Sequence, residues 1–174
     1  ARAAHSARRP ARAAVSDAVI EHVSAVNKGP QLRVRDCQHG QIDLIFGAHF
    51  VEVGVHAYTG ETRVRRMLAV CDSGRILNPI TARSQVIGGM VMGVGAALSE
   101  DMALDRARGF FANHDMASYE VAVHADIPEQ EVIFLDTLDA AASPLKAKGV
   151  GELGLCGVAA AVANGLYNAT GVRV

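Results

Sequence analysis

One glycine-rich turn constrains the fold of this chain more than any other segment. It covers residues 148–152 and directly precedes a stretch rich in alanine, leucine and valine, residues 153–167, which predicts a helix. Gly149 and Gly151 can adopt positive φ and let a ligand approach the backbone. The first amide N–H groups of a helix have no partners within it, so here they would point back at the turn. The turn is therefore a candidate site for an anion such as phosphate.

Glu152 ends this turn, at the positive end of the dipole of the expected helix. The dipole favours an ionised carboxylate, which suits a residue that accepts a proton, whereas burial in an apolar pocket would disfavour the charged form. A glutamate in a first helical turn more often serves to cap the helix and to complement its dipole. The pattern alone leaves both roles open.

Composition excludes several classes of function. Half of the residues are hydrophobic and the formal net charge is −1, so nothing indicates a nucleic-acid partner. No stretch approaches the roughly 18 consecutive apolar residues that a membrane-spanning helix requires, and we expect a soluble chain. The three cysteines, Cys37, Cys71 and Cys156, are far apart and show no CxxC spacing for zinc or an iron–sulfur cluster. We expect reduced, mostly buried thiols, and any redox centre would come with a cofactor.

The first quarter of the chain, residues 1–45, is a poorly defined N-terminal segment. Its opening is rich in arginine and alanine, like a targeting peptide or a linker, and it does not begin with methionine, which favours a processed or truncated chain. A short helix is expected over residues 16–26, and short strands over residues 32–35 and 42–46. Residues 46–174 are expected to form the domain.

A β-hairpin is the clearest element of that domain. Residues 50–56 alternate valine with other side chains, a polar turn follows at residues 58–61, and residues 62–70 return as a second strand. A polar loop then ends in Asn78-Pro79, and a helix is expected from about residue 80 or 81 to residue 99, with Pro79 at or near its first position. A loop-rich stretch at 101–127, a strand at 132–135 and a closing helix at 153–168 complete the order. Because no βαβ repeat occurs, we expect an α+β fold with a mixed sheet, a β-hairpin and packed helices.

The helix that follows Pro79 contains four glycines, Gly88, Gly89, Gly93 and Gly95. Each costs about 1 kcal/mol relative to alanine in a helix, so their presence requires a reason. Close packing against another backbone and direct contact with a flat ligand explain them about equally well.

Three separated stretches carry a resemblance to a known family. They are residues 47–53, residues 74–89, which begin Gly-Arg-Ile-Leu-Asn-Pro, and residues 148–164, which begin Lys-Gly-Val-Gly-Glu. In this order and at this spacing they resemble the C-terminal part of the molybdopterin-binding large subunit of the xanthine dehydrogenase and aldehyde oxidase family. The resemblance is closest to bacterial aldehyde oxidoreductases that use molybdopterin cytosine dinucleotide, and it runs from about residue 46 to residue 174.

The resemblance implies a fold, a catalytic residue and a cofactor. The fold would be part of the second molybdopterin-binding domain. A glutamate at the position of Glu152 accepts the proton of a molybdenum-bound hydroxide in that family, the oxygen attacks the substrate carbon, and the metal has no protein ligand. The positions that would contact the cofactor are Ile76, Leu77, Asn78, Pro79, Ile80, Thr81, Gln85, Lys148, Gly149, Val150 and Gly151. Iron–sulfur clusters and FAD would lie on partner subunits.

The family's large subunit is several times longer than this chain, and its active site lies between two halves. The resemblance therefore implies a C-terminal piece that hydroxylates aldehydes or N-heteroaromatic compounds only with the remaining half of the subunit and its redox partners. A truncated, non-catalytic remnant that packs against a partner is the alternative. A nucleotide-binding module that uses the glycine turn is weaker, since neither GxGxxG after a strand nor a P-loop occurs. The compartment, cytoplasmic or periplasmic, stays open.

Overall fold

The structure is a computed structural model that describes residues 45–135, 137–140 and 142–174. The helix expected at residues 16–26 and the strand expected at 32–35 lie outside the described residues, as does most of the strand expected at 42–46. Phe46, the last residue of that expected strand, begins the first strand of the structure.

The predicted hairpin is confirmed. Strand β1 (Phe46–Val55) and strand β2 (Thr62–Asp72) pair antiparallel, with a register shift between Glu52 and Val53. Alternating side chains of β2 point to opposite faces of the sheet, and Val64, Ala69 and Cys71 are buried in the core.

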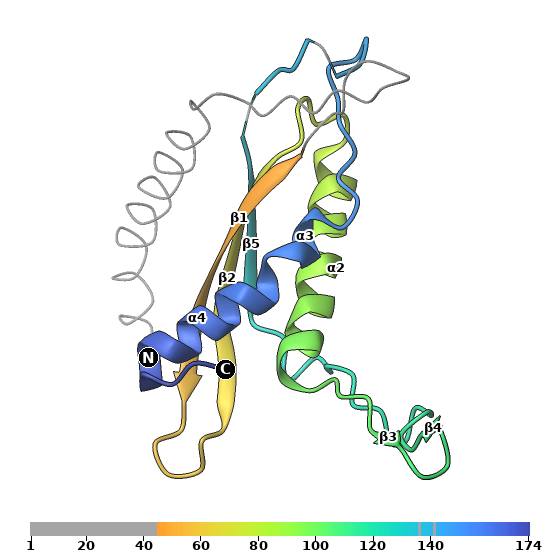
Figure 1. Ribbon diagram of the computed structural model, residues 1–174. Helices are drawn as coiled ribbons and strands as arrows, with labels where there is room; N and C mark the ends of the chain where they lie inside the picture. The colour runs from red at the N-terminus through yellow and green to blue at the C-terminus, as the bar shows by residue number, and fades with distance from the viewer. Residues whose placement is uncertain (1–44, 136, 141) are drawn as a thin grey trace.

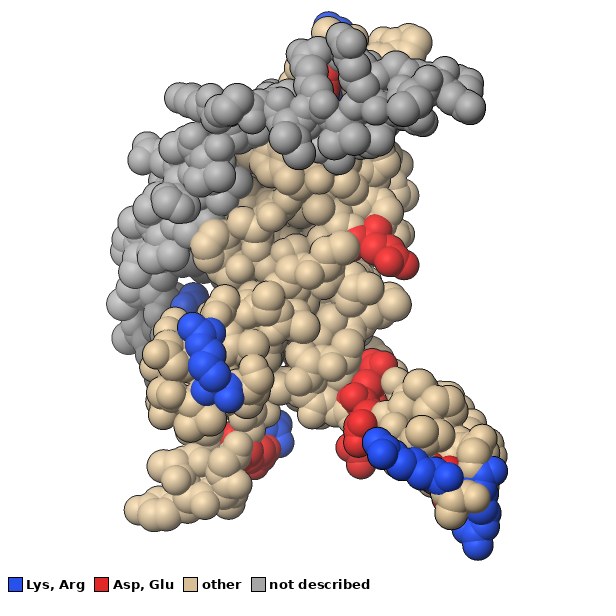
Figure 2. Space-filling model, in the orientation of Figure 1, with Lys and Arg blue, Asp and Glu red and all other residues tan. Residues whose placement is uncertain are grey.

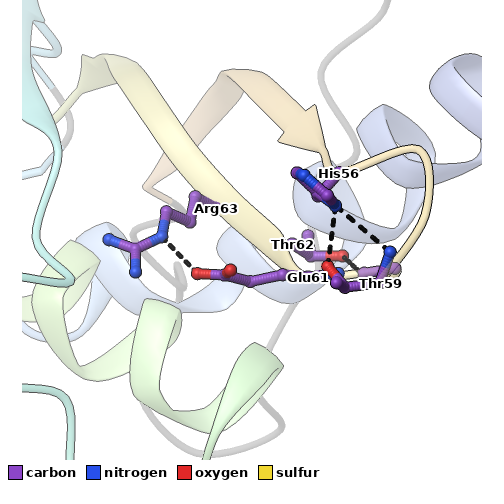
Figure 3. A network of polar contacts seen from close by, with 6 residues as sticks. His56, Thr59, Glu61, Thr62 and Arg63 are labelled. Carbon is purple, nitrogen blue, oxygen red and sulfur yellow. Dashed lines mark hydrogen bonds and ion pairs between the residues drawn. The ribbon is translucent and has the colours of Figure 1, made fainter.

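Polar contacts hold the turn of the hairpin closed (Figure 3). The imidazole Nδ1 of His56 accepts the Thr59 amide N–H at 3.1 Å, and the His56 amide donates to the Glu61 carbonyl at 2.8 Å. Gly60 has φ of +75°, which a side chain would disfavour. Arg63 donates from Nε to the Glu61 carboxylate at 2.6 Å, but both side chains are exposed, so this ion pair adds little to stability.

A third strand makes the sheet mixed. Strand β5 (Glu129–Phe134) pairs parallel to β2, which gives the strand order β1-β2-β5. The expected strand at 132–135 is confirmed, although it begins earlier and ends one residue sooner. The predicted α+β class with a mixed sheet is confirmed, and helices pack beside the sheet (Figure 1).

The predicted long helix is present as α2 (Pro79–Leu98), which begins one or two residues earlier than expected. The Asn78 side chain accepts hydrogen bonds from the amides of Ile80 and Thr81 at 3.1 and 3.2 Å, a cap that contributes about 1 kcal/mol, and Pro79 occupies the first helical position. The helix buries three large side chains in the core, Val86, Met90 and Val94.

The prediction of one closing helix is wrong. The chain forms a short helix, α3 (Leu153–Cys156), and then a longer one, α4 (Val158–Thr170), with Gly157 between them. Helix α3 packs on α2, whereas α4 packs on β1 and also contacts α2 (Figure 1). The break at Gly157 changes the direction of the chain, so that α4 can lie against β1 while both helices contact α2. Gly171 ends α4 in the left-handed conformation, as expected.

Residues 101–127 form an arm that projects from the body (Figure 1). It carries a two-stranded ladder, β3 (Leu104–Asp105) with β4 (Phe110–Phe111), closed by the turn at Gly109. Charged side chains gather on this arm, whereas the surface over α3 and α4 carries few (Figure 2). Within the described part of the chain, no helix is both long enough and apolar enough to cross a membrane.

Candidate functional site

An open groove lies between helix α2 and the turn that precedes α3. Its volume is about 480 Å³. The residues that line it come from one face of α2 and from the segment around the turn: Thr81, Ser84, Gln85, Gly88, Gly89, Met92, Gly151, Glu152 and Leu155. The groove therefore brings together the predicted base and part of the predicted cofactor-binding set.

The α2 side of the groove is a single helical stripe. Thr81, Gln85, Gly88 and Met92 recur at spacings of three and four residues, which places them above one another on one face. Gln85 was predicted from sequence as a site residue, and Ser84 and Met92 were missed. The same spacing would have found them, because residues on one face of a helix share whatever surface that face meets.

The turn is held to α2 by one side-chain hydrogen bond. The Gln85 amide donates from Nε2 to the Gly151 carbonyl oxygen at 2.9 Å. Gly151 has φ of +43°, whereas Gly149 does not adopt a positive φ, and the Leu153 amide donates back to the Val150 carbonyl at 3.0 Å. Glu152 follows directly and is exposed at the side of the groove.

The glycines of α2 differ in their surroundings, and close packing explains two of them. A Cβ on Gly89 would lie 2.9 Å from the Gly154 carbonyl carbon of α3, and one on Gly93 would meet the Val158 side chain, so these two positions permit close packing. A Cβ on Gly88 would meet nothing within 4 Å, and Gly88 lines the open groove. The backbone of Gly88 is therefore accessible from the groove.

A short backbone ladder places the two predicted cofactor-binding segments side by side. Gly74 and Ala147 form an isolated antiparallel bridge, and the amides of Arg75 and Lys148 donate to the carbonyls of Lys146 and Ser73 at 2.8 and 3.0 Å. Gly74 has φ of +64° and leaves room for the Lys146 carbonyl, which a Cβ would contact at 2.6 Å. This ladder therefore brings the start of residues 76–81 close to the start of residues 148–151.

The anion cradle expected at the turn does not form as the sequence suggested. Helix α3 has four residues, so few peptide dipoles align, and the Leu153 amide is already bonded to Val150. The ammonium of Lys148 lies 3.0 Å from the Asp139 carboxylate, and its side chain is only 9% exposed. Lys148 therefore forms an ion pair with the preceding loop.

The structure brings only part of the predicted set to the groove. Thr81, Gln85, Gly151 and Glu152 line it. The others lie outside its lining, at the start of α2 or beside the turn: Ile76, Leu77, Asn78, Pro79, Ile80, Lys148, Gly149 and Val150. Among these, Leu77 and Ile80 are 61% and 82% exposed, so apolar side chains are available next to the groove.

His49 contacts the segment that follows the turn, a contact that the sequence did not predict. Its Nε2 lies 3.1 Å from the Gly154 carbonyl oxygen, and its ring occupies the space where a Cβ on Gly157 would stand. A carbonyl only accepts, so Nε2 carries the proton and donates. Burial lowers the pKa of His49, which favours this neutral form, while the hydrogen bond to Gly154 raises it by less. His49 thereby ties β1 to α3.

The cysteines and acidic residues do not suggest a metal centre in the described part of the chain. No group of three or more histidine, cysteine, aspartate or glutamate side chains gathers there. Cys71 is buried, as expected, and burial raises its pKa to about 11. Cys156 is exposed, contrary to the expectation of mostly buried thiols, and its Sγ donates to the Glu152 carbonyl at 3.4 Å. Cys37 lies outside the described residues.

Comparison with known proteins specifies the class of domain to which this mixed sheet with packed helices belongs. The chain matches the family model of the molybdopterin cofactor-binding domain over residues 4–128, and it belongs to that family. The match takes in most of residues 1–45 and ends before the turn at residues 148–152.

Curated relatives are molybdenum-binding subunits. The chain is 74% identical over 129 residues to the aldehyde oxidoreductase molybdenum-binding subunit PaoC of Escherichia coli K12, a match that covers 74% of this chain and 18% of the relative. It is 38% identical to the putative xanthine dehydrogenase molybdenum-binding subunit XdhA of the same organism, over 74% of this chain and 17% of the relative. The chain thus spans about a fifth of the length of these relatives.

A solved structure shows the same architecture. The crystal structure of the aldehyde oxidoreductase from Desulfovibrio desulfuricans aligns with a TM-score of 0.69 and 34% identity, covering 78% of this chain and 14% of that one. The family resemblance stated from the sequence motifs is therefore confirmed.

Proposed function

We propose that this chain is a segment of the molybdenum-binding subunit of an oxidoreductase that hydroxylates aldehydes or N-heteroaromatic compounds with oxygen from water. In this proposal Glu152 is the proton acceptor. The observation that carries it is the position of Glu152, whose exposed carboxylate stands beside a groove that the main chain of α2 and of the turn leaves open. The 74% identity to an aldehyde oxidoreductase subunit favours aldehydes as substrates.

The groove has the chemistry to hold a molybdopterin. Gly88 and Gly151 have no atom within 4 Å of where a Cβ would be, so a flat ring system can approach the backbone there. Thr81 and Gln85 supply polar groups along the same face, and residues 76–81 and 148–151 flank it. The bound cofactor would supply the two-electron oxidation of the substrate. We propose the cytosine dinucleotide form, with residues 46–174 as the binding domain.

The chain's own contribution is to place one base. The Glu152 carboxylate would take up a proton from the oxygen nucleophile as that oxygen attacks the substrate carbon, and release it to solvent afterwards. Its open position at the groove allows that release. We place the iron–sulfur clusters and FAD on partner subunits, because these relatives are themselves molybdenum-binding subunits.

The test is Glu152→Gln in the complete molybdenum-binding subunit with its partners. Base catalysis of this kind supplies about a hundred- to ten-thousand-fold in rate, so we expect turnover of an aromatic aldehyde to fall by that factor while molybdenum content stays at the wild-type level. Glu120→Gln, which changes an exposed carboxylate on the arm, is the matched control and should leave turnover unchanged. Wild-type turnover in Glu152→Gln would contradict the proposal.

A segment that packs against a partner without activity of its own is the second candidate. The exposed apolar side chains of the arm favour it, with Leu104 at 53%, Phe110 at 44% and Phe111 at 42% exposure. The same pair of variants separates the two candidates, because a packing segment has no use for the Glu152 carboxylate.

A further inference from the structure

We propose that Gln85 is a positioning residue, which orients Glu152 by holding the carbonyl of the residue before it. This inference rests on the proposed role of Glu152 as proton acceptor. It assigns Gln85 a function different from the cofactor contact that the sequence motifs suggested. The juxtaposition that carries it is the 2.9 Å hydrogen bond from the Gln85 side chain on α2 to the Gly151 carbonyl in the turn.

The bonded carbonyl belongs to the peptide that joins Gly151 to Glu152. Fixing that oxygen fixes the plane of the peptide and the position of the Glu152 Cα within it. With Glu152 at φ of −99°, the direction of its Cα–Cβ bond then follows from that plane. Gly151 needs this restraint because glycine, at φ of +43° here, can adopt many other backbone conformations. The Gln85 side chain of α2 thereby restricts the backbone conformation of the turn, which its glycines alone would not restrict.

The surroundings of Gln85 are rigid enough for this task. Gln85 lies one residue before Val86, which is fully buried, and Val86 in turn packs its backbone against Gly154 of α3. The Leu153 amide closes the far side of the turn on the Val150 carbonyl. The turn is therefore held on both sides of Glu152, by Gln85 before it and by the α2–α3 contact after it.

The proposed role requires the amide group of Gln85. Its Nε2 donates to a carbonyl, which glutamate of nearly the same size cannot do at neutral pH. Gln85→Glu therefore removes the donor and adds repulsion with little change of shape, and Gln85→Leu removes the donor without adding charge. Arg83→Ala is the matched control, because Arg83 is an exposed side chain of the same helix that does not line the groove.

The experiment measures three quantities in the complete molybdenum enzyme that carries each variant. For both Gln85 variants we expect kcat for an aromatic aldehyde to fall roughly 10- to 100-fold, as for a misplaced catalytic group, with KM nearly unchanged and molybdenum content at the wild-type level. Hydrogen exchange of a peptide covering residues 149–153 should become several times faster, because the turn loosens. Arg83→Ala should match the wild type in all three.

Two results would overturn the inference. Loss of molybdenum in step with kcat would make Gln85 a cofactor contact, and unchanged exchange at residues 149–153 would show that the turn does not depend on it. The proposed function is judged separately. If Glu152→Gln keeps normal turnover while the Gln85 variants loosen the turn, the role of Glu152 fails. If Glu152→Gln is inactive while the Gln85 variants behave as wild type, the positioning role alone fails.

Discussion

At the scale of single residues, one imidazole connects the hairpin to the segment that carries the candidate base. His49 donates to the Gly154 carbonyl at 3.1 Å and fills the space that Gly157 leaves open. Burial is the larger influence on its pKa and lowers it from the ordinary value of 6.5, because the charged ring would lose hydration. The neutral form of His49 is therefore the form that the fold favours.

This preference makes the free energy of unfolding depend on pH. The folded-state pKa of His49 lies below the unfolded-state value, so its contribution is fully present above pH 6.5 and is lost as the pH falls through the folded-state pKa. Because the ring is only partly buried, solvent screens part of this effect.

The variant His49→Gln tests this dependence. Glutamine can still donate to Gly154 but does not titrate, so we expect the fall in urea midpoint between about pH 7.5 and pH 5 to be smaller in the variant than in the wild type. An equal fall in both proteins would mean that other groups account for the pH dependence.

Residue-scale contacts also explain where sequence reasoning about the site succeeded and failed. Gln85 and Glu152 were predicted from their motifs, and the structure places both at the groove. Lys148 belongs to the same motif as Glu152, but its ammonium pairs with Asp139 in a loop that carries no recognisable pattern. Such a pairing depends on tertiary structure and cannot be derived from spacing. The roles of these residues in binding and catalysis stay predictions.

At the scale of elements, two neighbouring glycines of helix α2 have different surroundings, since one is packed against α3 and the other is open. Gly89 faces α3, where a Cβ would lie 2.9 Å from backbone atoms of Gly154 and Leu155, whereas Gly88 faces open space. Backbone cannot move aside as a flexible side chain can. The two positions therefore form a natural matched pair.

We expect Gly89→Ala to lower the free energy of unfolding by about 1–3 kcal/mol through overpacking. Gly88→Ala should raise it by up to about 1 kcal/mol, because alanine has the higher helix propensity and meets nothing. Urea denaturation of both variants provides the comparison. A change of the same sign in both would contradict the assignment of close packing to one face only.

Elements with local signals were the predictable part of the fold. The valine alternation of the hairpin and the Asn78-Pro79 start of α2 are encoded within a few residues, and both predictions are confirmed. The break in the closing helix was not predictable in this way, because it depends on His49 of β1 and on Val86 of α2. The parallel pairing of β5 with β2 is also a tertiary choice that a single strand pattern does not contain.

At the scale of the whole molecule, the chain by itself leaves its groove open and apolar side chains exposed. Leu77 and Ile80 beside the groove are 61% and 82% exposed, and Phe110 and Phe111 on the arm are about half exposed, at 44% and 42%. Surfaces of this kind normally face another part of a protein. The proposal that the remaining half of the subunit covers them leads to a direct test.

We expect the isolated chain to bind a hydrophobic dye, to hold molybdopterin weakly and to oxidise no aldehyde at a measurable rate. Fluorescence with 8-anilinonaphthalene-1-sulfonate, metal analysis and an aldehyde assay, each compared with the complete subunit, check these three expectations. Stoichiometric molybdenum in the isolated chain would contradict the proposal that the site needs its other half.

The parallel pairing of β2 with β5 has a consequence for how the molecule assembles. The hairpin closes through residues 56–61, whereas the register that joins Arg66 to Glu129 can form only after α2 and the arm have been brought round (Figure 1). Closing the longer loop has the larger entropic cost, so we expect β1 and β2 to associate first and β5 to join last. Pulsed hydrogen exchange during refolding should then protect the amides of β1 and β2 before those of β5. Because α2 lies in the loop between β2 and β5, we expect the groove beside α2 to form only in this late phase.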